Sequence, residues 1–309
     1  MFDKKIVPME PQAKKILEKN SSFAYQVKWD GIRLLAFGKG TKIRLQSRSQ
    51  KDKTGLYPEL AMLPGLVTAE SFILDGELVS LQDKRPSFYT LMQRERAGKV
   101  NISGAIRLPP VHYMLFDILF IDGAWLLNEP WKVRQEILKE SVTENGSLYL
   151  TSSYGDGKRL LQAVKELGME GVVAKKKDSP YIPGPRKSSY WLKTKLEQTL
   201  RAYVGGLALR NKNPISLLLG LYENDDAKIS GLEKSLRYIG SVSSGLTEKE
   251  LGNWYERSQK DSLNASPFIN PPPARGEREF LWLKPHRKVK VVFNEWTTGL
   301  KLRAPRLAR

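Results

Sequence analysis

The 309-residue chain contains no cysteine and only two histidines, His112 and His286. Disulfide bonds, thiolate catalysis and cysteine-based zinc sites are therefore excluded, and catalysis by an imidazole base is not expected. No apolar run is long enough to span a membrane, and the N-terminal residues lack the apolar segment of a signal peptide. We therefore expect no membrane contact, and the absence of cysteine agrees with a cytoplasmic protein.

Acidic residues are also fewer than basic ones. The chain has 33 aspartates and glutamates against 51 lysines and arginines, which gives a formal net charge of +18. This excess is spread along the chain, whereas a membrane-surface protein more often concentrates it on one amphipathic helix. Distributed positive charge favours a long polyanion, such as nucleic acid, as the partner. A basic protein that is merely soluble remains an alternative, because charge alone is a weak signal.

The length and texture of the chain predict two domains. In residues 1–196, strand-like and helix-like runs alternate irregularly and indicate an α+β fold built on an antiparallel sheet: strands at 23–27, 32–37, 42–46 and 111–120, helices at 13–18, 88–97, 130–140 and 157–167. Asp75-Gly76-Glu77 is expected to separate two short strands. In residues 197–309, short strands recur with one helix near 247–257, a pattern that suits a small β-barrel of the OB-fold type.

The most informative segment is residues 26–33, Gln-Val-Lys-Trp-Asp-Gly-Ile-Arg. Lys28 stands at the end of a strand-like run, beside an Asp-Gly turn that lets a ligand approach the backbone closely. Taken alone, this lysine is explained as well by a solvated strand end before a hairpin turn. The rest of the chain decides between the two interpretations.

The segment matches Lys-x-Asp-Gly-x-Arg, the nucleotidyl-lysine motif of ATP-dependent DNA ligases, RNA ligases and mRNA capping enzymes. Further segments resemble the remaining motifs of this superfamily in the same order: Ser47–Ser49, Leu74–Val79, Leu115–Leu119, Glu170–Lys175, Trp191–Lys195 and Leu302–Arg306. The stretch Asp178–Tyr181, Pro183-Gly184 and Arg186, ahead of Trp191, is similar to the ligase module of bacterial end-joining proteins in particular. This resemblance implies an adenylation (nucleotidyltransferase) domain followed by an OB-fold domain.

The resemblance also implies residue roles. Lys28 would attack the α-phosphate of ATP and pass the AMP to the 5′-phosphate of a nick, which the 3′-hydroxyl then seals. Nucleotide contacts would come from Gln26, Arg33, Arg48, Glu77, Phe116, Arg303 and Arg306. Phe116 would stack on the adenine, whereas Arg303 and Arg306 would orient the departing pyrophosphate. Glu170 and Glu77 would serve Mg²⁺ or Mn²⁺.

The residue types suit these roles. A lysine attacks only when it is neutral, and neighbouring cations or partial burial favour that form. Lys193 and Lys195 are the expected cations, because their alternate spacing puts them on one face of a strand with Trp191. Carboxylates such as Glu170 are ligands that Mg²⁺ prefers. Without the motifs, plainer explanations stand: a core phenylalanine, surface arginines and turn-flanking acids.

Two features bear on the choice of nucleotide and substrate. Residue 26 is Gln where the superfamily often has Glu, but its side-chain oxygen can still accept a hydrogen bond from the adenine amino group. The chain also lacks the four-cysteine zinc element of NAD-dependent ligases, so ATP is the expected donor. The expected partner is duplex DNA with nicks or ends. By resemblance a Ku-like end-binding protein is a further expected partner, and we expect a monomer.

Other functions remain open at this point. Within the superfamily, an RNA ligase or a capping-type guanylyltransferase is the alternative. A non-catalytic nucleic-acid-binding protein that has kept the fold is the alternative of a different class.

Overall fold

The computed structural model describes residues 1–14, 20–82, 85–97, 110–185, 188–222, 236–274, 278–297 and 299–308. The chain divides into two compact units, Met1–Leu196 and Glu197–Arg309. The helix predicted at 13–18 lies largely outside the described residues, as does Arg186, while Ala13 belongs to a short strand.

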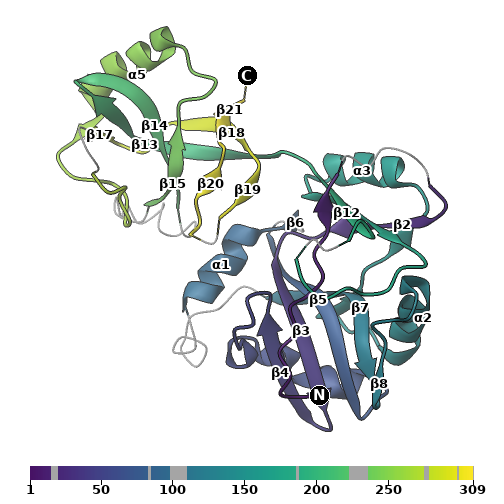
Figure 1. Cartoon of the computed structure of the whole chain (residues 1–309). Coiled ribbons are helices and arrows are strands. Elements are labelled where there is room, and N and C mark those ends of the chain that lie inside the picture. The colour runs from purple at the N-terminus through teal and green to yellow at the C-terminus, as the bar shows by residue number, and fades with distance from the viewer. Residues whose placement is uncertain are drawn as a thin grey trace. The chain divides into compact units, whose positions relative to one another are not determined.

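One sheet of the first unit carries Lys28 at a strand end. Its strands follow the order β1 (Gln12–Ala13), β12 (Trp191–Lys195), β11 (Gly171–Lys176), β2 (Phe23–Lys28) and β10 (Ser153–Tyr154). β11 runs antiparallel between β2 and β12, so segments far apart in sequence become neighbours. One face, with Tyr25, Val172 and Leu192, packs against α3 (Gly157–Glu166) through Leu160 and Val164 (Figure 1). The opposite face therefore remains for the functional side chains.

The second sheet begins soon after Lys28, because only Trp29, Asp30 and Gly31 separate β2 from β3. Its strands are β4 (Lys42–Ser47), β3 (Ile32–Lys39), β5 (Ser71–Gln82), β7 (Val111–Ile121) and β8 (Ala124–Trp125), with β6 (Arg85–Pro86) beside β5 and β9 (Leu148–Leu150) beside β7. A buried cluster that includes Ala24 and Trp191 from the first sheet also includes Leu35 and Ile73 from the second. This apolar cluster joins the two sheets.

Four helices pack against strands of the second sheet: the 3₁₀ helices η1 (Thr54–Leu56) and η2 (Pro58–Leu66), and the α-helices α1 (Phe88–Ala97) and α2 (Trp131–Ser141). α2 buries Trp131, Arg134 and Leu138, the spacing of one helix face. α3 begins at Asp156, whose side chain accepts hydrogen bonds from two backbone amides of the first turn. α2 also carries Gln135, whose side chain contacts that of Gln26.

The second unit is rich in strands. They are β13 (Gln198–Arg210), β14 (Asn213–Tyr222), β15 (Leu236–Val242), β16 (Ser262–Leu263), β17 (Arg278–Leu283), β18 (Lys288–Phe293) and β21 (Arg306–Leu307), with the separate pair β19 (Glu295–Trp296) and β20 (Leu302–Arg303). The long strand β13 pairs with β18 through its first half and with β17 through its second half. The helix α5 (Glu248–Asp261) begins with a capping box between Thr247 and Glu250. The predicted mixed α+β architecture is confirmed.

The expected break at Asp75-Gly76-Glu77 is wrong. β5 runs through these residues without interruption, although its pairing with β7 shifts register near them. Gly76 is required here because a Cβ would lie 2.6 Å from the ring of Tyr113. The glycine thus serves close packing in a strand rather than a turn.

Candidate active site

The β2, β11 and β12 strands align their functional side chains in rows. Lys28 pairs with Gly171 of β11, which pairs in turn with Lys195 of β12. In the next row Gln26 pairs with Val173, and Val173 pairs with Lys193. Because directly opposed residues point to the same side of a sheet, all of these side chains share the face that α3 does not cover.

Gly171 permits the central row. Its φ of +151° is disfavoured for residues with a side chain, and a Cβ would lie 2.1 Å from the carbonyl oxygen of Thr194. Glu170 precedes it, two residues after the turn at Gly168 that follows α3. Glycine at 171 therefore lets β11 begin between β2 and β12, with Glu170 immediately before the first residue of the strand.

Glu170 joins two lysines. One carboxylate oxygen lies 2.5 Å from the Nζ of Lys28, and the other lies 3.0 Å from the Nζ of Lys195. The Glu170 side chain is only 4% exposed, whereas that of Lys28 is 20% exposed and open to a ligand. The nearest charged partner of Lys28 is thus an acid, and Lys195 reaches the same acid from the other side. Lys193 lies one row away from Lys28, opposite Val173, and its predicted role as a neighbouring cation stays a prediction.

The facing sheet contributes Arg33 and Glu77, which pair across β3 and β5. Burial raises the pKa of Glu77 to about 8. Lys28 and Arg33 act in the opposite direction, and repulsion from Glu170 adds to the rise. Two carboxylates, Glu77 and Glu170, therefore influence each other close to the Lys28 amine.

Arg33 is already engaged within the protein. Its guanidinium forms a two-pronged ion pair with the buried Asp75, at 2.6 and 2.9 Å, and donates to the carbonyl of Met9 at 2.5 Å. Tyr181 donates to the same carboxylate at 2.7 Å. Burial alone would lower the pKa of Arg33, but Asp75 raises it above its ordinary value. The predicted contact of Arg33 with a nucleotide stays a prediction.

Aromatic rings and a buried lysine lie at the centre of the unit. The half-buried Phe116 meets Trp191 edge-on, with ring centroids 6.2 Å apart, and the Arg33 guanidinium lies 5.2 Å from its ring. The Nζ of Lys175 lies 4.3 Å from the Phe116 ring and 4.1 Å from the Trp191 ring. Burial lowers the pKa of Lys175 to about 7. Phe116 thus combines a firmly held backbone with a partly open ring.

Gln26 is buried, 1% exposed, on the same face as Lys28. The two hydrogens of its Nε2 are shared among three acceptors: the carbonyl of Thr151 at 3.1 Å, Ser153 Oγ at 3.0 Å and Gln135 Oε1 at 3.3 Å. Within the described part of the chain, its Oε1 is buried without a hydrogen-bond partner. An orphaned acceptor of this kind suits a ligand that brings a donor.

The predicted arginines outside this cluster lie at the surface. Arg48 pairs with Glu10 at 2.7 Å and is 62% exposed. In the second unit, Arg303 pairs with Glu295 at 2.6 Å and Arg306 with Glu197 at 2.5 Å. The structure therefore brings together Gln26, Lys28, Lys195, Glu170, Glu77, Arg33 and Phe116, and their roles toward a ligand stay predictions.

Sequence reasoning missed several side chains of this region. Asp75 and Lys175 lie inside the motifs Leu74–Val79 and Glu170–Lys175, which predict no role for them, and Gln135 on α2 lies outside every motif. A further buried pair, Asp117 with Arg134 at 2.7 Å, supports the strand that carries Phe116. Charged residues within apolar runs were the one available signal, because such residues are seldom buried unless paired.

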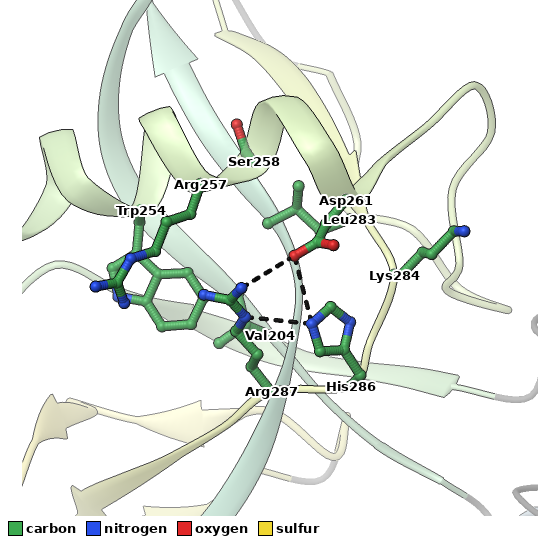
Figure 2. A pocket seen from close by; sticks show the side chains of 9 residues that line it. All are labelled: Val204, Trp254, Arg257, Ser258, Asp261, Leu283, Lys284, His286 and Arg287. Carbon is green, nitrogen blue, oxygen red and sulfur yellow. Dashed lines mark hydrogen bonds and ion pairs between the residues drawn. The ribbon is translucent and has the colours of Figure 1, made fainter.

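The second unit contains a small pocket that no motif indicated. It is lined by Val204, Trp254, Arg257, Ser258, Asp261, Leu283, Lys284, His286 and Arg287 (Figure 2). Asp261 lies 3.3 Å from both His286 and Arg287, so the one acid is surrounded by basic side chains. Among the described residues, no three or more histidines and acids gather as a metal cluster, and no helix could cross a membrane.

Comparison with known proteins gives a consistent result. Residues 6–195 match the model of the ATP dependent DNA ligase domain, and residues 210–309 match the ATP dependent DNA ligase C terminal region. The multifunctional non-homologous end joining DNA repair protein LigD of Mycobacterium tuberculosis is 34% identical over 92% of this chain, which spans only 35% of that relative. DNA ligase C1 of Mycolicibacterium smegmatis is 34% identical over 71% of this chain and 65% of its own length.

Solved structures agree with this assignment. The mycobacterial DNA ligase D complexed with ATP and MES is 31% identical, with a TM-score of 0.56, over 98% of this chain and 93% of that one. The ligase domain of LigD from M. tuberculosis is 30% identical, with a TM-score of 0.53, over 98% and 94%. Both support the predicted fold, a nucleotidyltransferase domain with an OB-fold domain. The chain belongs to the ATP-dependent DNA ligase family.

Proposed function

We propose that this chain seals breaks in duplex DNA at the expense of ATP, with Lys28 as the nucleophile that becomes adenylylated. The observation that carries the proposal is the Lys28–Glu170–Lys195 cluster at the strand ends of one sheet. It supplies an amine, a proton acceptor and a second cation within one small region. Such a combination suits attack on a phosphate.

In the first step the Nζ of Lys28 forms a bond to the α-phosphorus of ATP, and the bond from that phosphorus to the β-phosphate oxygen breaks. Pyrophosphate leaves with the electron pair. The ammonium of Lys28 must first lose a proton, and the Glu170 oxygen at 2.5 Å is the nearest acceptor. Lys195 can then balance charge on the phosphate. Arg303 and Arg306 would contact the departing pyrophosphate.

In the second step an oxygen of the DNA 5′-phosphate attacks the adenylate phosphorus, and the phosphorus–nitrogen bond to Lys28 breaks. The amine recovers its proton as it leaves. In the third step the 3′-hydroxyl attacks the 5′-phosphorus, AMP departs and the hydroxyl proton is released. Only the first step uses the free amine of Lys28 on ATP, so the steps can be separated by experiment.

The nucleotide pocket is supported by Gln26 and Phe116. The unpaired acceptor of Gln26 fits the amino group of adenine, and the partly open ring of Phe116 fits stacking. Repulsion between the charged forms of Glu77 and Glu170 helps to raise the pKa of Glu77, and a bound cation would relieve this repulsion. Mg²⁺ or Mn²⁺ would be held by these two carboxylates together with phosphate and water oxygens, and would neutralise phosphate charge.

The wider role follows from the relatives. The LigD proteins are named for non-homologous end joining, and this chain spans about a third of their length. We infer that its substrates are nicks and joined ends in duplex DNA, bound with the help of the net charge of +18. The same proposal includes a Ku-like end-binding protein as partner, a monomeric state and action on DNA in the cytoplasm.

Labelled ATP tests the proposal. Wild-type protein incubated with α-labelled ATP and Mg²⁺ should retain the label after denaturation, and Lys28→Ala should not. Both should seal a nick whose 5′-phosphate has been adenylylated in advance, the variant at least weakly. A wild-type protein that retains no label and seals no nick would remove the proposal. Labelling by GTP alone would favour a capping-type enzyme instead.

A further inference from the structure

The side-chain amide of Gln26 has two unequal ends. Its Nε2 faces three acceptors, the carbonyl of Thr151, the hydroxyl of Ser153 and Oε1 of Gln135, at 3.0–3.3 Å. Its Oε1 is buried and has no hydrogen-bond partner among the described residues. Burying an acceptor without a partner costs stability, so this end of the amide is kept for a purpose that folding alone does not explain.

Two backbone carbonyls fix which end faces which way. A carbonyl only accepts, so the carbonyl of Thr151 requires the Nε2 end of Gln26. The carbonyl of Phe116 likewise requires the Nε2 end of Gln135, which donates to it at 3.0 Å. Gln135 then turns its Oε1 toward Gln26. A flip of either amide would set oxygen against oxygen, so the orientation of both is determined.

Gln135 therefore connects two predicted contacts of the nucleobase. Through its oxygen it holds the amide of Gln26, and through its nitrogen it holds the backbone of Phe116. The Phe116 carbonyl accepts a second hydrogen bond, at 3.1 Å, from Lys175. The stacking ring and the acceptor of Gln26 are thus held in one hydrogen-bonded network that includes a residue outside every motif.

We propose that Gln135 is a positioning residue that sets nucleobase specificity: it holds the acceptor end of Gln26 toward the base and so selects a purine with an amino group at carbon 6. The inference rests on the proposed use of ATP. A 6-amino purine donates a hydrogen to the unpaired oxygen. A 6-oxo purine presents a second acceptor there and leaves both oxygens unpaired, which a buried site rejects strongly.

The network also explains why residue 26 is Gln in this chain. A glutamate would place a carboxylate oxygen against the Thr151 carbonyl and against Oε1 of Gln135. Gln26→Glu should therefore impair ATP use on its own. Arginine at 135 has donors for the carboxylate and for the Phe116 carbonyl together. The double substitution Gln26→Glu/Gln135→Arg should recover much of the loss.

The test compares ATP with inosine triphosphate, which carries an oxygen in place of the amino group. The measured quantity is kcat/KM for transfer of labelled nucleotide to Lys28. Wild-type protein should prefer ATP by roughly a hundredfold or more. Gln135→Met should reduce that ratio by roughly tenfold or more, because the Gln26 amide then loses one of the contacts that fix its orientation. Gln162→Leu, which removes an exposed amide on α3, should leave the ratio unchanged.

The outcomes separate this inference from the proposed function. A wild-type protein that accepts no nucleotide contradicts the function itself. A labelled wild type whose ATP preference survives Gln135→Met contradicts only the role of Gln135. A double variant whose kcat/KM for ATP is no higher than that of Gln26→Glu contradicts the coupling of the two side chains. If Gln135→Met lowers the thermal unfolding midpoint sharply, the preference for ATP over inosine triphosphate is measured in Gln135→Leu and in the double variant instead.

Discussion

The carboxylate of Glu170 lies 2.5 Å from the Nζ of Lys28, although 142 positions separate the two residues in the chain. The contact forms because β11 enters the sheet directly beside β2, and Gly171 stands opposite Lys28. The ion pair places a proton acceptor directly against the Lys28 amine. Removal of the proton and attack on phosphate therefore depend on the same carboxylate.

Glu170→Gln should reduce transfer of AMP from ATP to Lys28 by roughly a hundredfold or more, because a positioned proton acceptor contributes about that much. It also leaves Lys28 and Lys195 without their shared counter-ion. Label retained on the denatured protein measures the effect. Glu166→Gln, at an exposed position of α3, is the matched control. A Glu170→Gln variant that labels at the wild-type rate would contradict the assigned role.

Asp75→Asn should lower the free energy of unfolding by about 3–5 kcal/mol, since it leaves the buried guanidinium of Arg33 without its counter-ion. Lys132→Gln breaks an exposed pair with Asp178 and should cost far less. Chemical denaturation of both variants measures the difference. Equal small losses would show that the Arg33–Asp75 pair does not support the fold.

Glu77 should make the folded protein less stable as pH rises. Its pKa is about 8 in the fold and close to 4.5 when exposed, so the folded state holds the proton that the unfolded state has lost. The contribution is present below pH 4.5 and is lost as pH rises toward 8, with a slope of at most about 1.4 kcal/mol per pH unit. Glu77→Gln should remove this slope in denaturation curves measured across that range. A slope that persists in Glu77→Gln would assign it to another group.

Lys175 should act with the opposite sign at higher pH. Its pKa is about 7 in the fold against 10.5 when exposed, so the unfolded state binds a proton that the folded state lacks. Stability should therefore rise with pH between these two values. Lys175→Met keeps an unbranched side chain between the rings of Phe116 and Trp191 and should abolish the rise. Denaturation of this variant at pH 7 and pH 10 measures it; an unchanged rise would contradict the assignment.

The local features of this fold could be read from the sequence. Strand-like runs, including the continuous apolar run at 111–120, predicted the strands that became β2, β3, β4 and β7. Alternate spacing predicted that Trp191, Lys193 and Lys195 share a face, and their partners Lys175, Val173 and Gly171 agree. Periodicity succeeds here because it reports which side of a strand a residue faces.

The contacts that organise the site could not be predicted in this way. Arg33 meets Asp75 across 42 positions, and Gln26 meets Gln135 across 109. The pattern of apolar and polar residues along one strand does not indicate which distant segment lies opposite it. The motifs therefore indicated the site residues but not the side chains that contact them. The error at Gly76 has the same origin, because the nearby ring of Tyr113 comes from a different strand.

The short link Trp29–Gly31 carries one more implication, for engineering. It joins the strand that ends in Lys28 to the sheet that holds Arg33 and Glu77, and Gly31 fits because a Cβ there would lie 2.1 Å from the Leu78 carbonyl oxygen. A single inserted residue would shift the Lys28 amine out of step with Arg33 and Glu77 at once. The hairpin at Gly40, where a Cβ would meet open space, should accept a tag or a new terminus instead.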